Sequence, residues 1–150
     1  MIELKGINKS YGNLRVLDNV SLSIGNNEII TIVGPSGAGK TTLLQIAGTL
    51  DRPDSGSVFY DGEDIARFND RRLSAFRNRN IGFIFQCHQL LPEFTAQENV
   101  ALPAMIAGES GKGAQKRAAE LLGLLGLGDR LRHKPAQMSG GEKQRAAIAR

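Results

Sequence analysis

The feature that most constrains the fold is the glycine-rich segment GPSGAGKT at residues 34–41. It stands between an apolar run, EIITIV, and a segment of helical composition, TLLQIAG. Its spacing matches the pattern G-x-x-x-x-G-K-[ST], which occupies the turn from a buried strand into a helix. Glycines let consecutive backbone N–H groups face one concave surface, and the following helix adds its positive N-terminal end. The sequence therefore predicts a phosphate-binding loop rather than an ordinary glycine-rich turn.

Two side chains of this loop have expected roles in binding a nucleoside triphosphate. Lys40 is expected to neutralise the β- and γ-phosphates and so to act in catalysis, and the Thr41 hydroxyl is expected to bind Mg²⁺. A phosphate loop does not by itself name a reaction, because kinases, GTPases, helicases and transport ATPases all contain one. The residues expected to contact the nucleotide here are Gly34, Pro35, Ser36, Gly37, Ala38, Gly39, Lys40, Thr41 and Thr42.

The apolar pattern on both sides of the loop predicts strands. IELKGI at 2–7 and VSLSI at 20–24 alternate apolar and polar residues, which predicts an antiparallel, strand-rich beginning. The run at 28–33 is apolar on both faces, as is typical of a central strand that is covered on both sides. IGFIF at 81–85 predicts a second buried strand.

After Gln86 the apolar residues recur at helical spacing, which predicts a helical lobe with a flexible connector at 108–113. The expected fold class is therefore α/β: a P-loop NTPase with an antiparallel β N-terminal subdomain and an α-helical subdomain. We expect a single domain over residues 1–150. Within it, 1–86 form the β-subdomain and P-loop core, and 87–150 form the helical subdomain.

Composition narrows the classes of protein that fit. The 150 residues are 41% hydrophobic, which suits one globular domain, and the single Cys87 excludes an internal disulfide. No run of about 18 apolar residues occurs, so a membrane connection is expected to come through a partner. The net charge of +4 permits an acidic partner, but we interpret five arginines as a solvated helix face and expect no nucleic-acid partner. They are Arg67, Arg71, Arg72, Arg77 and Arg79.

The amide of Gln86 follows the second expected strand. Its oxygen can contact Mg²⁺ or an attacking water and can withdraw when the helical lobe moves, because an amide both accepts and donates. Gln86 is therefore a candidate catalytic and metal-binding residue. Taken alone, it would more often be an ordinary side chain at the end of a strand.

A second anion-binding device is expected where Ser139, Gly140, Gly141 and Glu142 precede a run of helical composition. Ser139 is a candidate N-cap, and Glu142 is an acidic residue of the first turn. A chain with one phosphate cradle needs a second only if that second cradle closes over a nucleotide held by another copy. This argument predicts a head-to-tail dimer with two nucleotides between the copies, and a capped helix without a ligand is the alternative.

These motifs, GPSGAGKT, Gln86 and MSGGE, resemble in order and separation the ATP-binding subunit of an ABC transporter. The resemblance covers essentially the whole chain and implies ATP and Mg²⁺ as cofactors. The family's signature is usually LSGGQ, so Met138 and Glu142 are departures. The first is a packing change and the second occurs among relatives. The resemblance also implies that Tyr11 stacks on adenine.

Within the family, HQLLPEFTAQENV at 88–100 resembles most closely the lipoprotein-releasing ATPase, with macrolide-exporter and cell-division ATPases as alternatives. This region of the family faces the membrane subunit, which implies a docking surface, although burial in the lobe's core is an equal alternative. The implied location is peripheral, at the cytoplasmic face of the inner membrane. The residues expected to dock are Leu90, Leu91, Pro92 and Phe94.

The resemblance also implies catalytic groups that this sequence does not contain. Family members continue with an apolar strand that ends in Asp-Glu, which orders Mg²⁺ and the attacking water, and with a histidine loop. We expect the 150-residue chain alone to hydrolyse ATP no faster than background, whereas a longer parent is expected to be an active ATPase. We also expect an apolar sheet edge beside residues 28–33.

Two soluble classes of ABC ATPase are alternatives to a transporter subunit. A DNA-repair ATPase inserts a long coiled coil between the loop and the signature, and the short spacing from Lys40 to Ser139 leaves no room for one. A translation factor needs a second phosphate loop, and this sequence contains one loop. A nucleotide-binding module without catalysis is a third alternative.

Overall fold

The computed structural model describes residues 1–150 as two compact units, Met1–Arg77 and Asn78–Arg150. The boundary between the two units falls between Arg77 and Asn78, whereas the sequence suggested a division after Gln86. No helix is both long enough and apolar enough to cross a bilayer.

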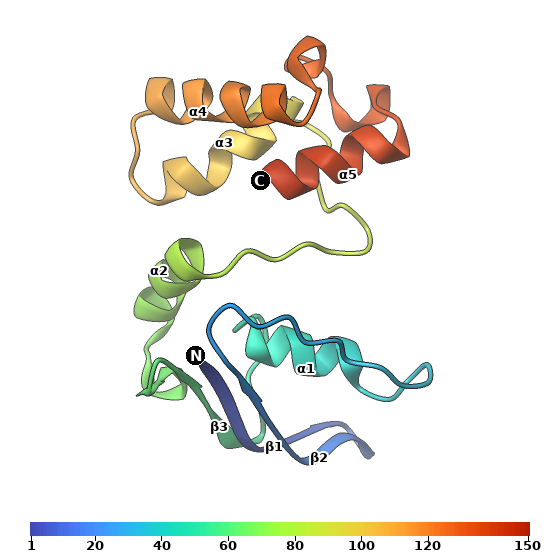
Figure 1. The fold of residues 1–150 in the computed structure, drawn as a ribbon, viewed down its shortest axis with the longest axis vertical. Helices are drawn as coiled ribbons and strands as arrows, with labels where there is room; N and C mark the ends of the chain where they lie inside the picture. The colour runs from blue at the N-terminus through green and yellow to red at the C-terminus, as the bar shows by residue number, and fades with distance from the viewer. The chain divides into compact units, whose positions relative to one another are not determined.

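The first unit is built on a four-stranded antiparallel sheet (Figure 1). Its strands are β1 (Ile2–Tyr11), β2 (Leu14–Ile24), β3 (Ser55–Tyr60) and β4 (Glu63–Asp64), in the spatial order β2-β1-β3-β4. β1 pairs with β2 on one side and with β3 on the other, all antiparallel. The antiparallel sheet that the alternating apolar and polar residues predicted for the N-terminal part of the chain is therefore confirmed.

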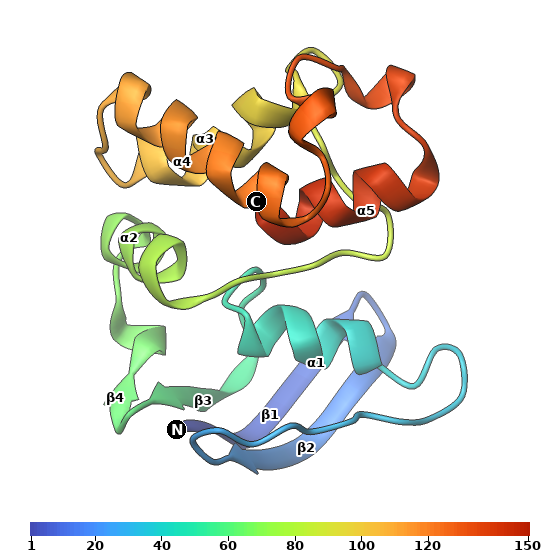
Figure 2. The same cartoon turned by 45° about the horizontal axis from the view of Figure 1, so that its top comes forward.

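Helix α1 (Lys40–Ala47) lies against one face of this sheet, as both views show (Figures 1 and 2). Its buried residues Leu43 and Ile46 pack in one core with Leu4, Ile7 and Val58 of the strands. The helix ends at Gly48, whose N–H donates to the Leu44 carbonyl. The 3₁₀ turn Ile65–Arg67 and helix α2 (Asp70–Asn80) close the other end of this core with Ile65, Phe68 and Leu73.

The two expected central strands are not strands, and this prediction was wrong. Residues 28–33 and 81–85 have no regular structure, and the exposed fractions of Ile29, Val33 and Ile84 are 95%, 82% and 54%. The expected sheet edge beside 28–33 is accordingly not formed. A strand is stable only where a neighbour takes its backbone N–H and C=O groups, and all the pairings of the sheet involve β1 to β4 alone.

The second unit is a helical lobe, as the sequence predicted (Figure 2). It consists of α3 (Ala96–Ile106), α4 (Gly111–Leu124), α5 (Gly140–Ala149) and two 3₁₀ turns, Gly128–Arg130 and Pro135–Gln137. α4 begins inside the segment 108–113 that we expected to be a connector, because the Ser110 hydroxyl caps it by accepting from the N–H of Gly113. The core of the lobe is formed by Ala96, Val100, Ala101, Ala114, Ala118, Leu122, Leu127, Met138 and Ala146.

Candidate functional site

The glycine-rich loop presents an open helix N-terminus. Gly39 is the N-cap of α1 and has no side chain to bond the first-turn N–H groups, and the first turn contains no acidic residue. In contrast, α3, α4 and α5 are each capped by a hydroxyl of their own chain. A helix N-terminus carries a partial positive charge and donors without partners, so the whole first turn of α1 is open to an external anion.

Glycine at positions 37 and 39 satisfies two different constraints. Both residues have φ of 81°, in the left-handed region that side chains disfavour. A Cβ at Gly39 would lie 2.8 Å from the Val16 carbonyl oxygen and 2.8 Å from Leu17 Cδ2, so Gly39 is pressed against β2. A Cβ at Gly37 would meet nothing within 4 Å. Gly39 therefore fixes the start of α1 to the sheet, while Gly37 shapes the open side of the loop.

Lys40 Nζ lies back over the loop. It donates to the carbonyl oxygens of Gly34 at 2.8 Å and Pro35 at 2.6 Å. Thr41 is exposed in the first turn of α1, where its hydroxyl is free to bind a cation or an anion. The loop thus combines an ammonium group, a hydroxyl and open N–H groups, which are the groups that a magnesium-bound triphosphate requires.

The predicted second anion-binding site, at Ser139–Glu142, is the capped N-terminus of helix α5. The Glu142 N–H donates to Ser139 Oγ at 3.3 Å and the Ser139 N–H donates to Glu142 Oε2 at 2.8 Å, which confirms Ser139 as the N-cap of α5. The backbone N–H of Ser139 and the guanidinium of Arg130, at 2.9 Å, lower the pKa of Glu142 to about 2. Gly140 and Gly141 are exposed and keep their first-turn N–H groups free of these bonds. Met138 is buried in the lobe's core, in keeping with a packing role.

Tyr11 ends β1 and is 49% exposed. Its hydroxyl donates to Asp51 Oδ2 at 2.8 Å, and Lys9 Nζ lies 5.3 Å from the centre of its ring. Lys9 also donates to Asp51 Oδ1 at 3.0 Å. Tyr11 therefore has a fixed orientation and an accessible ring, while adenine stacking on it stays a prediction.

Gln86 is exposed in a bend of the second unit, and Lys40 belongs to the first. Ser139, Gly140, Gly141 and Glu142 also belong to the second unit. The predicted contacts of Gln86 and of the α5 N-terminus with a nucleotide held by the loop are therefore not tested by the geometry within either unit.

The segment expected to dock is exposed on a rigid support. Leu91, Pro92 and Phe94 are exposed, and Leu90 alone of the four packs against the lobe's core. The amide of Asn99 is fully buried beneath them. It accepts from the Leu91 N–H and donates to the carbonyl oxygens of Leu91 and of two residues near the start of α3. A buried Asn with its hydrogen bonds satisfied fixes the conformation of this loop.

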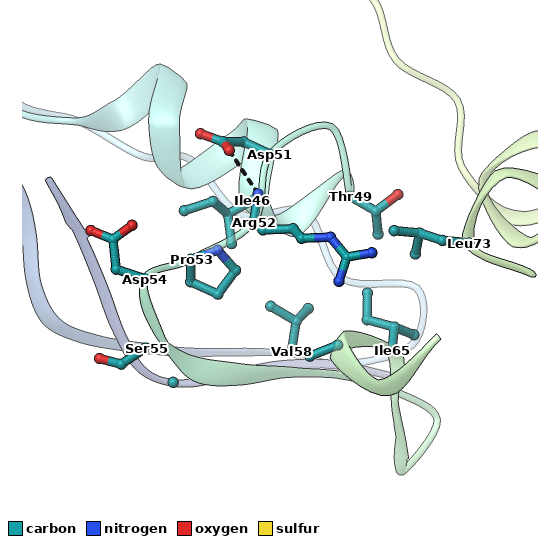
Figure 3. A pocket seen from close by; sticks show the side chains of 12 residues that line it. Ile46, Thr49, Asp51, Arg52, Pro53, Asp54, Ser55, Val58, Ile65 and Leu73 are labelled. Atoms are coloured by element: carbon teal, nitrogen blue, oxygen red, sulfur yellow. Dashed lines mark hydrogen bonds between the residues drawn. The ribbon is translucent and has the colours of Figure 1, made fainter. Parts of the chain in front are cut away.

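The pocket in Figure 3 lies away from the loop. It has a volume of about 230 Å³ and an apolar floor formed by Ile46, Val58 and Leu73, and none of its lining residues belongs to 34–42. Arg52 lies across it and pairs with Asp70 Oδ1 at 2.9 Å. This hollow between α1, β3 and α2 therefore belongs to the packing of the first unit and not to the phosphate site.

Three of the five arginines interpreted as a solvated face have partners in their own unit. Arg67 pairs with Asp64, Arg72 pairs with Glu63, and Arg77 donates to both oxygens of Thr49. Sequence reasoning missed the partners that matter most for the site, namely Asp51, Asn99 and Arg130. Only Asn99 gave a signal, as a polar residue at an apolar position of the α3 pattern.

The family model described as ABC transporter matches residues 17–150. The chain belongs to the ABC transporter family. One similar member is the lipoprotein-releasing system ATP-binding protein LolD of Bacteroides thetaiotaomicron, which is 63% identical to this chain. The match covers all of this chain and 69% of the length of that relative. The corresponding protein of Porphyromonas gingivalis is 59% identical over all of this chain and 68% of the relative.

Solved structures of ABC transporter cassettes are also similar. The chain matches a dimeric post-hydrolysis state of the ATP-binding cassette MJ0796 bound to ADP and Pi, with a TM-score of 0.91, 42% identity, and coverage of 99% of this chain and 68% of that one. The family and this likeness together confirm the expected P-loop ATPase fold class.

The packing of the loop predicts different effects for the same substitution at two glycines. Gly37→Ala should lower the free energy of unfolding by about 1 kcal/mol, the cost of a left-handed alanine. Gly39→Ala should cost about 2 kcal/mol more, because its methyl group meets β2. Urea unfolding of the two variants measures the difference, and equal losses would contradict the packing of Gly39 on β2.

The low pKa of Glu142 predicts that the contribution of its carboxylate to the free energy of unfolding depends on pH. Its carboxylate stays ionised in the folded state down to about pH 2, whereas unfolded Glu142 protonates near its ordinary value of 4.5. The stability lost in Glu142→Gln should therefore be constant above about pH 5 and should shrink as the pH falls from there towards 2. Glu93, an exposed carboxylate of the same unit without a hydrogen bond or ion pair, provides the control. Glu93→Gln should show no such trend. Urea unfolding of wild type and of both variants at each pH measures the effect, and a loss in Glu142→Gln that does not shrink below pH 5 would contradict the role of the Ser139 and Arg130 bonds.

Proposed function

We propose that this chain is the ATP-binding part of a motor subunit whose longer parent hydrolyses ATP to drive a membrane transporter. We further propose that the transporter releases lipoproteins from the inner membrane. The observation that carries the proposal is the uncapped N-terminus of α1 beneath the glycine loop, with Lys40 Nζ lying over the loop. The names of the LolD relatives support the lipoprotein assignment.

In this mechanism the loop binds the triphosphate through backbone N–H groups and the α1 N-terminus. Lys40 leaves the carbonyl oxygens of Gly34 and Pro35 and moves onto the β- and γ-phosphates, where its charge offsets the negative charge of the transferring phosphoryl group. Magnesium, when bound, supplies further neutralisation of the phosphates. Thr41 and Gln86 are the residues of this chain that would hold it.

The proposed partner across the nucleotide is a second copy of the chain in head-to-tail orientation. Gly140 and Gly141 would offer their free N–H groups to the phosphates bound by the other copy's loop. The dimeric form of the similar cassette, bound to ADP and Pi, supports this arrangement. Such a dimer closes on ATP and reopens after hydrolysis, which converts phosphate chemistry into motion of the helical lobe.

The proposed membrane contact is the exposed surface of Leu91, Pro92 and Phe94 at the cytoplasmic face of the inner membrane. Asn99 supports this surface from below, so its shape does not depend on a partner. Exposed apolar side chains on a rigid loop are suited to a membrane subunit's cytoplasmic segment. Macrolide-type export and a cell-division complex are the alternative pathways.

The proposed nucleotide site predicts that ATP binding and hydrolysis are impaired when Lys40 is replaced but not when Lys112 is replaced. Lys40→Ala in the full-length protein should weaken ATP binding by roughly tenfold to a hundredfold, because a charged hydrogen bond to phosphate is lost. It should also reduce hydrolysis to background. Lys112→Ala, an exposed lysine of α4, is the control and should change neither. Calorimetry and phosphate release measure both quantities, and unaltered binding by Lys40→Ala would refute the proposed site.

The docking proposal predicts the effect of charge on the exposed surface. Phe94→Asp should abolish co-purification with the membrane subunits and leave ATP binding intact, because a carboxylate cannot enter an apolar interface. Leu124→Asp alters a side chain of the same unit that is 83% exposed and should retain the partners. Retention by Phe94→Asp would refute the surface. Membrane subunits that export a drug or engage the division machinery, and bind no lipoprotein, would refute the pathway.

A further inference from the structure

We propose that Asp51 is a positioning residue for nucleotide recognition, because it ties the ring of Tyr11 to the helix whose N-terminus binds the phosphates. The inference rests on the proposed stacking of adenine on Tyr11 and extends it to a residue without an assigned role. The link is the 2.8 Å hydrogen bond from the Tyr11 hydroxyl to Asp51 Oδ2.

Asp51 is held rigidly against the C-terminal end of α1. The N–H groups of Leu50 and Asp51 both donate to the Gln45 carbonyl in the last turns of the helix, at 2.8 and 3.3 Å. The Asp51 carboxylate also accepts from the N–H of Arg52 at 2.7 Å, the bond drawn in Figure 3. Just before it, Thr49 is buried in a left-handed conformation and bonded to Arg77. The position of this carboxylate is therefore set by the backbone and not by solvent.

The same carboxylate is held at β1 by a second side chain. Lys9, whose side chain is only 12% exposed, pairs with Asp51 Oδ1 at 3.0 Å and donates to the Arg52 carbonyl at 2.6 Å. Partial burial acts to raise the pKa of Asp51, but the hydrogen bonds from Lys9 and Tyr11 outweigh it and leave the pKa below its ordinary value. Asp51 thus stays ionised and keeps both bonds near neutral pH.

This arrangement fixes the ring that a base would meet. Lys9 Nζ lies over one face of Tyr11, and half of the tyrosine stays exposed. A tyrosine at the end of a strand beside a tight turn would otherwise sample several rotamers, which a base would have to restrict on binding. With Asp51 in place, the ring and the phosphate loop are attached to opposite ends of one short helix, and their separation is set before the nucleotide arrives.

The test measures the part of the affinity that depends on the base. ATP and tripolyphosphate, each with Mg²⁺, are titrated into the full-length protein, and the ratio of their affinities reports the contribution of the nucleoside. Tyr11→Ala should reduce this ratio by about fivefold to a hundredfold, since stacking is lost. Tyr11→Phe and Asp51→Ala should each reduce it by about fivefold, the value of one hydrogen bond, without weakening tripolyphosphate.

A double variant separates positioning from a general effect on folding. If Asp51 acts through the Tyr11 hydroxyl, Tyr11→Phe with Asp51→Ala should reduce the ratio no further than either change alone. Asp70→Ala removes a carboxylate from the same unit that bonds neither Tyr11 nor Lys9, and should leave the ratio unchanged. Tyr11→Phe probes the same bond from the other side if Asp51→Ala folds poorly.

Each result distinguishes the two proposals. If Tyr11→Ala leaves the ratio unchanged, adenine does not stack on Tyr11, and both the stacking and the inference are overturned. If Tyr11→Ala reduces the ratio while Tyr11→Phe and Asp51→Ala do not, the stacking stands and the role of Asp51 is overturned. Equal weakening of ATP and tripolyphosphate by Asp51→Ala would also overturn the role, because it would show a loss of structure and not of orientation.

Discussion

An open helix N-terminus pressed against a sheet is the constraint on which the site depends. No side chain accepts a hydrogen bond from the N–H groups in the first turn of α1. Because Gly39 has no Cβ, this turn can lie close to β2. The lysine and the threonine of the site lie in this same turn. Lys40 begins the helix and reaches back over the loop, and Thr41 faces outward from the same turn.

The two helix N-termini that carry the motifs are built differently, and the difference suits their proposed roles. α1 offers its whole first turn to an anion, while α5 already bonds Glu142 and is left with the N–H groups of its two glycines. The first arrangement can hold a triphosphate by itself. The second can add only a few contacts to a triphosphate that another copy already holds. This division favours a shared site between two copies over two independent sites.

The elements that were predicted correctly depend on local sequence. The alternating strands β1 and β2, the start of α1 at the phosphate loop and the cap of α5 at Ser139 all follow from residues within a few positions. The apolar runs 28–33 and 81–85 have the same strand-forming composition, yet they are irregular and exposed. Composition gives a segment the tendency to form a strand, but a strand also needs a paired neighbour, and that neighbour is a property of the fold.

The sequence by itself determined the chemistry of this protein: a phosphate loop, a signature before a helix and the family to which both belong. These motifs are short because backbone N–H groups bind phosphate wherever glycine, lysine and a helix start occur at fixed spacing. Only the tertiary structure decided that Asp51 meets Tyr11, that Asn99 supports the exposed loop and that Arg130 holds Glu142 ionised. Each of these bonds joins residues from different elements, so their geometry exists only once the elements have packed.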